Sequence, residues 1–155
     1  MLVFAVLVAG AAGAASSRGH AHARTVVYRI SGTAWDLGTS AGCPDGSLRY
    51  SILSVGGRSI GTSTLCVGEA QKRDAGGRVT VVEKVVQTDA FADGWLRTRS
   101  TQISTTSADG AKATIRIHGV VAGGTGRYRG VRGTIVGAGG RRGDAVEIRV
   151  TVRLR

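Results

Sequence analysis

The sequence predicts an all-β protein, an eight-stranded antiparallel up-and-down barrel of the calycin-like class. Two observations carry this prediction. Apolar and polar residues alternate with a period of two, and turn signals interrupt the chain at regular intervals. No stretch between the turns has the apolar period of a helix. The short connections indicate antiparallel neighbours. A sandwich is the alternative, but the absence of long crossovers favours a barrel, which leaves no open sheet edge.

Seven turn signals divide the chain into eight extended segments. The turns are Pro44-Asp45-Gly46, Gly56-Gly57, Gly76-Gly77, Asp93-Gly94, Asp109-Gly110, Gly123-Gly124 and Gly139-Gly140. The segments are 25–34, 46–55, 59–67, 78–88, 95–105, 112–122, 126–137 and 144–154. The alternation is clearest in the last one, where Val146, Ile148 and Val150 interleave with Glu147 and Arg149, as in a half-buried strand.

Residues 1–23 are expected to be a signal peptide that precedes a single barrel domain, 24–155. The apolar run "MLVFAVLVAGAAGAA" has the length of a signal-peptide core and is too short for a membrane span. Small-residue cleavage sites lie at 12–14 and 21–23, and we favour the second because the chain becomes strand-like at Arg24. No basic residue precedes the apolar run, which is atypical. The sequence therefore predicts a secreted or extracytoplasmic protein.

The two cysteines, Cys43 and Cys66, are expected to form one disulfide. An even cysteine count in an exported chain favours a bridge; two free buried thiols are the alternative. In the chain-entropy model the bridge stabilises the fold by roughly 3 kcal/mol.

The chain is strongly basic, with 21 Lys and Arg residues against 10 Asp and Glu and a net charge of +11. Such a charge favours acidic partners. Between Arg127 and Arg155 lie eight arginines and two acids. Nucleic-acid platforms interleave several aromatics with their cations, whereas Tyr128 stands alone here. We therefore expect no nucleic-acid partner, and an anionic cell-envelope or extracellular polymer is the alternative ligand.

The segment "GGTGRYRGVRG", residues 123–133, combines five glycines with three arginines. A dinucleotide-binding loop needs G-x-G-x-x-G before a helix, but the third glycine comes one position late, at Gly130, and a strand-like run follows. A P-loop needs a lysine, which is missing. The glycines instead predict a tight turn at 123–126 and then a bent strand containing Gly130 and Gly133.

The longer stretch "VVAGGTGRYRGVRGT" resembles the signature of dirigent-protein and allene-oxide-cyclase-like barrels. There a strand ends in Gly-Gly-Thr-Gly, followed by an aromatic and then an apolar residue with Arg-Gly. The segment "RRGDAVEIRVTVRLR" resembles the closing dirigent strand. The clear match covers about the last third of the chain. The acidic motif of the first dirigent strand and the pocket residues of the cyclase have no counterpart that can be placed.

This resemblance implies an exported barrel, often a homotrimer, whose apolar cavity binds and orients a small apolar or amphipathic ligand without a cofactor. Dirigent proteins steer the coupling of phenoxy radicals, and allene oxide cyclases isomerise a fatty-acid epoxide. An enzyme of this kind would be an isomerase, a cyclase or a dirigent-type protein, and the catalytic residues are not assigned. By the motif, Arg132 is the candidate pocket cation, with Thr125 and Tyr128 as further ligand-binding candidates.

Three other residues are ligand-binding candidates if they point inward. Glu83 is flanked by valines and would be a buried carboxylate. Arg97 and Arg99 share one face of their strand with Trp95, and could hold an anion inside the barrel or lie in solvent outside it. His118 alternates with isoleucines and is expected on the opposite, wet face. No Cys/His cluster has metal-ligand spacing, so no metal site is predicted.

Overall fold

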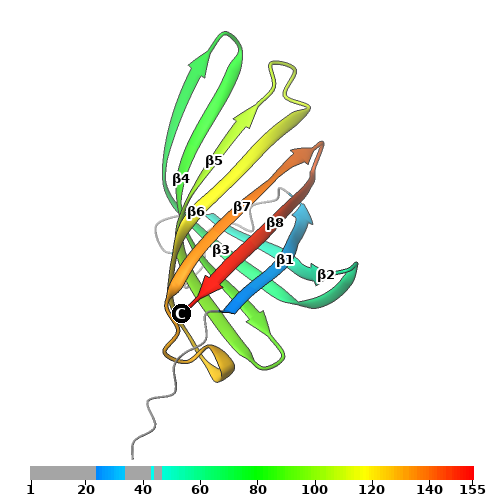
Figure 1. Ribbon diagram of the computed structural model, residues 1–155. Coiled ribbons are helices and arrows are strands. Elements are labelled where there is room, and N and C mark those ends of the chain that lie inside the picture. The colour runs from blue at the N-terminus through cyan, green and yellow to red at the C-terminus, as the bar shows by residue number, and fades with distance from the viewer. Residues whose placement is uncertain (1–23, 34–42, 44–46) are drawn as a thin grey trace, which may run out of the picture.

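The computed structural model describes residues 24–33, 43 and 47–155, and these form a closed barrel (Figure 1). Each strand runs antiparallel to its neighbours, and β1 pairs with both β2 and β8 to close the ring. The strands are β1 (Arg24–Thr33), β2 (Ser47–Val55), β3 (Arg58–Ala75), β4 (Arg78–Phe91), β5 (Gly94–Thr106), β6 (Lys112–Gly124), β7 (Gly133–Arg142) and β8 (Ala145–Leu154). The predicted fold class is confirmed. The expected signal peptide, 1–23, lies outside the described residues.

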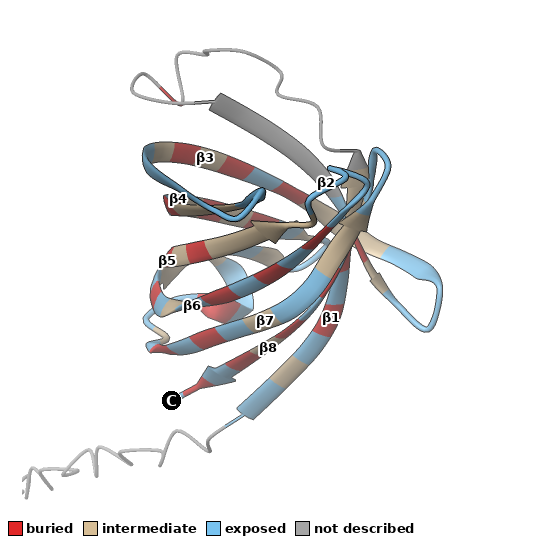
Figure 2. Cartoon of the chain, turned by 90° about the horizontal axis from the view of Figure 1, so that it is seen from above, coloured by how far each residue is buried: buried red, intermediate tan, exposed pale blue. Residues whose placement is uncertain are grey.

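Side chains alternate between the barrel interior and the outer surface along the strands, as Figure 2 shows by the change from buried to exposed. In β8, Ile148, Val150 and Val152 are buried, while Glu147 and Arg149 are exposed. Inward apolar residues from β1 and β5–β8 pack into one main core cluster, and Leu65, Val67 and Val85 of β3 and β4 form a second. The apolar residues of the period-two pattern thus fill the interior, and the polar residues between them face solvent.

The strands are strongly tilted. The path of hydrogen-bonded partners that leaves β4 at Val81 passes once around the barrel and returns to β4 at Phe91. Such a stagger is what closure of a small barrel requires. The two ends of the barrel therefore differ. We call the end with the β3–β4, β5–β6 and β7–β8 turns the mouth, and the end with the β2–β3, β4–β5 and β6–β7 connections the base.

The base is closed by an aromatic plug. A short 3₁₀ turn, η1 (Gly126–Tyr128), lies in the β6–β7 connection and buries the ring of Tyr128. This ring contacts Phe91, with centroids 5.3 Å apart, and Phe91 makes an edge-on contact with Tyr28 at 5.8 Å. The guanidinium groups of Arg24 and Arg127 lie over Tyr128 at 5.7 and 5.2 Å from the ring centroid. The η1 turn of the glycine-rich segment 123–133 thus closes the base of the barrel with the Tyr128 ring.

Two turn predictions in the glycine-rich part of the chain are wrong. Gly123 and Gly124 end β6, and β7 begins at Gly133, so the predicted strand over 126–137 starts too early. Gly139 and Gly140 lie inside β7, whose turn to β8 has its positive φ at Gly143. A Cβ on Gly139 would overlap the carbonyl oxygen of Glu147 on β8. These strand glycines are needed because backbones approach closely, a feature of barrel closure that turn propensity does not distinguish.

The β3–β4 hairpin is longer than the apolar pattern predicts. β3 extends to Ala75, whereas the predicted segment stops at residue 67. Beyond Gly68 its residues are exposed and polar, so apolar alternation ceases although the pairing to β4 continues. Gly76 and Gly77 both have positive φ, as the two-residue hairpin turn requires. The hairpin projects past its neighbours at the mouth (Figure 1).

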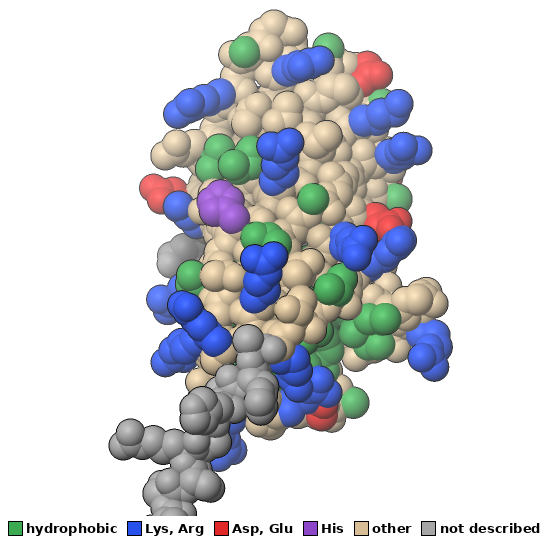
Figure 3. Space-filling model, viewed as in Figure 1, with side chains coloured by type: hydrophobic (Ala, Val, Ile, Leu, Met, Phe, Trp, Pro, Cys, Tyr) green, Lys and Arg blue, Asp and Glu red, His purple; other side chains and the backbone are tan. Residues whose placement is uncertain are grey.

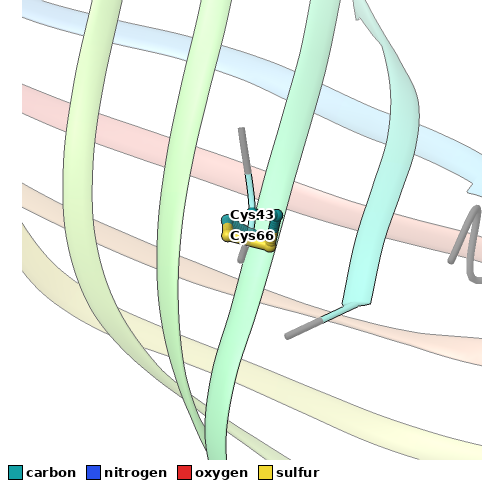
Figure 4. Close-up of a disulfide and its surroundings, with 2 residues drawn as sticks. All are labelled: Cys43 and Cys66. Carbon is teal, nitrogen blue, oxygen red and sulfur yellow. A yellow bond between two sulfur atoms is a disulfide. The ribbon is translucent and has the colours of Figure 1, made fainter. Parts of the chain in front are cut away.

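The disulfide prediction is confirmed, because Cys43 and Cys66 are bonded with their Cα atoms 5.4 Å apart. Cys66 alternates with the inward Leu65 and Val67, so it lies on the outer face of β3. The bond therefore attaches Cys43 to the outer face of β3 (Figure 4). A disulfide is compatible with an oxidising compartment.

Candidate functional site at the barrel mouth

A cavity of about 1030 Å³ opens at the mouth. It is lined by residues from the mouth ends of β1 and β4–β8 and from the β5–β6 turn. Gly32, Gly139 and Gly140 are among the lining residues, and at Gly139 and Gly140 the backbones of neighbouring strands approach closely. The volume is at the upper end of that of small-molecule pockets, and barrel mouths are a recurrent place for such pockets.

The hydrogen-bonded register explains how the cavity is built. One inward-facing row at the rim runs through Thr106, Ala113, Arg141, Val146 and Gly32, which are successive cross-strand partners. The next inward row, toward the base, contains Ile115 and Ile148, which are 6% and 3% exposed. Val146 packs against the same core cluster. The cavity lining therefore combines polar rim residues with Ala113 and Val146, and the buried Ile115 and Ile148 lie in the row beneath them.

The rim is basic. Arg78, Lys112, Arg141 and Arg142 line the cavity, and the one lining carboxylate, Glu147, is ion-paired with Arg29. Two further acids lie in the adjoining turns. Asp109 accepts hydrogen bonds from the Ser107 hydroxyl and the Ala111 N–H, which lower the pKa of its carboxyl, and Asp144 follows Gly143. Within the described residues, cations thus outnumber acids around the opening.

A second polar cluster lies inside the barrel near the base, around the fully buried Asp89 of β4. The carboxylate of Asp89 accepts hydrogen bonds from the Tyr28 hydroxyl, from Ser63 at 2.6 Å and from the Gln87 amide at 2.7 and 2.9 Å. Burial raises the pKa of Asp89, although the three donors act in the opposite direction. Burial also raises the pKa of Tyr28 well above its ordinary value. Tyr28 therefore keeps its proton and acts as a donor.

The interior polar groups of β4 and β5 are not all paired with each other. Gln102 donates to Glu83 at 3.0 Å, two inward positions below the rim. Deeper, the Gln87 Oε1 and the Thr98 hydroxyl are buried without a hydrogen-bond partner within the described part of the chain. These two residues are cross-strand partners. Unpaired buried polar atoms are costly, so this level of the barrel offers a donor and an acceptor to an additional polar group.

No family model, curated protein or solved structure matches this chain. The dirigent-like relationship therefore stays a prediction carried by the sequence motif. No helix in the described residues is long and apolar enough to span a membrane. Over the same residues, no three His, Cys, Asp or Glu side chains come close enough together to hold a metal ion.

Three predicted ligand-binding arginines do not face the barrel interior. Arg97 and Arg99 are exposed on β5 and alternate with the buried Leu96 and Thr98. Arg132 is exposed in the segment before β7, where its backbone pairs with Arg155 at the base. The alternation leaves them in solvent, because the inward positions are taken by residues that the core needs.

Two more candidates lie at the base, away from the mouth cavity. Tyr128 is buried in the plug. The Thr125 hydroxyl accepts a long hydrogen bond of 3.3 Å from the Trp95 N–H and thereby helps to hold the β6–β7 connection. Both contacts are structural. Of the predicted ligand-binding residues that lie on strands, only Glu83 faces the barrel interior, and it is 8% exposed.

The sequence reasoning missed Asp89 and the basic rim. Asp89 has the same strand parity as Glu83, with Val85 and Gln87 between them, so an inward Glu83 places Asp89 inside as well. The alternation therefore could have predicted a buried Asp89. It could not predict that Arg78, Lys112 and Arg141 lie together, because they come from three different hairpins that only barrel closure brings to one end.

Proposed function

We propose that this protein is an exported, dirigent-like barrel that binds and orients a small apolar or amphipathic molecule in the cavity at its mouth. One observation carries the proposal: an open cavity of about 1030 Å³ lies at the mouth, above a barrel interior that is filled by the core toward the base. A concave cavity whose lining includes Ala113, Ala145 and Val146 can shield the apolar part of a ligand from water.

A cyclisation or coupling step would depend mainly on positioning. Holding a reactive ligand in one conformation can lower a barrier without a cofactor. The Glu83–Gln102 pair supports this reading, since it is the first polar pair toward the base from the rim. The cavity would thus bind and orient the ligand, and a chemical step would be an additional activity.

Mass spectrometry of molecules extracted from protein purified in its native host tests the proposal. The expected result is a stoichiometric small molecule with a substantial apolar part. Val146→Trp, which fills the rim, should abolish co-purification. The matched control is Val136→Trp, because Val136 is 47% exposed on the outer face of β7. The proposal fails if no small molecule is recovered, or if both variants retain it equally.

A second candidate function is favoured by the outer surface. Arg116, Arg149 and Arg29 lie in one cross-strand row on the outside of the barrel, with Ala138 between the first two. Arg29 and Arg149 are directly opposite each other, and Arg29 is ion-paired with Glu147. Figure 3 shows basic side chains spread over this face with few acidic ones. An anionic polymer lying along the row would pair with Arg116 and Arg149, which have no ion pair within the described residues.

Binding to immobilised heparin and to polyphosphate at increasing salt tests this second function. Polymer binding by the outer face should weaken steeply with salt, as expected for exposed charges. It should also weaken in Arg149→Gln and not in Lys112→Gln, which removes one charge at the mouth. Equal weakening in both variants would mean attraction by net charge alone and would contradict a specific outer surface.

The homotrimer implied by the resemblance is also a proposal. The exposed apolar residues Val27, Val120 and Val136 lie on β1, β6 and β7 and could meet another copy. Val136 and Val27 lie in one cross-strand row with Thr151 between them, so a second copy could cover this small apolar patch. Sedimentation velocity measures the oligomeric state directly, and a monomer at all accessible concentrations would contradict the proposed trimer.

A further inference from the structure

The inward row at the rim carries one charged residue, Arg141, between two apolar neighbours. Arg141 pairs across the sheet with Ala113 on β6 and with Val146 on β8. Both neighbours also line the cavity. A guanidinium thus lies at the rim of the cavity, in a row with two apolar lining residues.

Two turns hold this guanidinium in place. Its Nη1 donates to the carbonyl oxygen of Gly143 at 2.7 Å, and its Nη2 donates to that of Gly110 at 3.0 Å. These acceptors belong to the β7–β8 and β5–β6 turns. Both are neutral, so the positive charge of Arg141 is not compensated by a carboxylate within the described residues. A half-buried cation fixed by neutral acceptors is preorganised for an anion.

The charges around the opening favour the same ligand. Arg78, Lys112 and Arg142 line the cavity with Arg141, Glu147 is ion-paired with Arg29, and the turn acids Asp109 and Asp144 are outnumbered. Positive charges in a concave, partly apolar site focus the potential on the opening and attract anions. A purely apolar ligand would leave these cations without an ionic partner and would gain nothing from their charge.

We infer that the cavity selects an amphipathic acid, a molecule with one oxyanionic head group on an apolar body. The head group binds Arg141, with Lys112 contributing at the rim, and the apolar body lies against Ala113 and Val146 toward Ile115 and Ile148. This inference rests on the proposed function and names the ligand class for the same cavity. A carboxylate and a phosphate monoester share the chemistry that Arg141 recognises.

Displacement of a fluorescent fatty-acid analogue from the full barrel tests the inference, with decanoate, decyl phosphate, decanol and decyltrimethylammonium as competitors. Decanoate or decyl phosphate should bind at least about tenfold more tightly than decanol, as expected for a charge-assisted hydrogen bond. The cationic compound should bind most weakly. The two acids, compared with each other, identify which head group the rim prefers.

Arg141→Gln should remove the preference for the acids over decanol, measured as the ratio of their affinities in the same variant. The matched control is Arg149→Gln, which loses the same charge from the outer face and should keep the preference. Because Arg141 also connects two turns, Lys112→Gln provides a second test: no side-chain hydrogen bond of Lys112 is present within the described residues, and its loss should weaken the acids by a smaller factor.

The outcomes separate the two proposals. Equal binding of acids and decanol, or an unchanged preference in both Arg141→Gln and Lys112→Gln, overturns the inference and leaves the ligand-binding barrel standing. Failure of all four decyl compounds to displace the probe, or of the probe to bind, counts against the inference and against the cavity as a binding site for apolar chains.

Discussion

The hydrogen bond between Tyr28 and Asp89 gives the sharpest prediction about the interior. Tyr28→Phe keeps the ring and its contact with Phe91 but removes the donor to Asp89. Tyr28 is 2% exposed and Asp89 is 0% exposed, so water cannot replace the lost donor. Hydrogen bonds to charged groups contribute about 1.5–3 kcal/mol. The free energy of unfolding should therefore fall by about 2 kcal/mol.

Urea denaturation followed by circular dichroism measures this loss. With a slope of roughly 2 kcal/mol/M, the midpoint should move down by about 1 M with the slope unchanged. Tyr128→Phe is the matched control. Tyr128 is equally buried, but its hydroxyl makes no hydrogen bond within the described residues, so its loss should cost less than about 0.5 kcal/mol. Equal midpoints for the two variants would refute the argument.

Three further predictions concern stability. Burial raises the pKa of Asp89, so the folded state binds the Asp89 proton more tightly than the unfolded state does. The stabilisation by Asp89 is therefore largest at acid pH and is lost as pH rises through the folded pKa. Denaturation at successive pH values should show the protein losing stability relative to Asp89→Asn as pH rises, and a constant difference would mean that the pKa is ordinary. Replacing Cys43 and Cys66 by serine should cost roughly 3 kcal/mol, and an unchanged urea midpoint would exclude a bridge that stabilises the fold. Gly139→Ala should destabilise the barrel by at least about 2 kcal/mol through backbone overlap, whereas Gly123→Ala, whose added Cβ meets no atom within 4 Å, should be nearly neutral; similar melting temperatures for both would contradict the close strand approach.

The alternation of apolar residues was sufficient to predict the strands that bury one face. In β8 each inward valine or isoleucine is followed by a polar residue, and the structure reproduces this pattern. β3 beyond Gly68 could not be predicted in the same way, because both of its faces are in solvent and its residues carry no alternation. Pairing to β4, a long-range contact, maintains that part of the strand.

Glycine was the least reliable guide. Gly76 and Gly77 do form a turn with positive φ, but Gly139 and Gly140 serve the close approach of β7 to its neighbours. Sequence alone does not distinguish these two uses of glycine. The same ambiguity placed the start of the seventh strand at residue 126, where the structure has the turn that seals the base.

The candidate site was predictable only where strand parity defines it. Glu83 faces the barrel interior, as expected if it and not Lys84 is the inward residue. Asp89 has the same strand parity and is therefore predicted to be buried as well. The inward options for Arg97 and Arg99 did not hold. Arg141 had no local signal: its position depends on the register of β6, β7 and β8 and on two turns that close over it.

Chemical-shift mapping on the ¹⁵N-labelled protein shows directly whether the mouth is the binding site. On titration with decanol or decanoate, we expect shifts that saturate at the amides of Thr106, Ala113, Gly139 and Val146, with the base and the outer strand positions unchanged. Shifts confined to the outer row of Arg116 and Arg149, or to the plug around Tyr128, would contradict it.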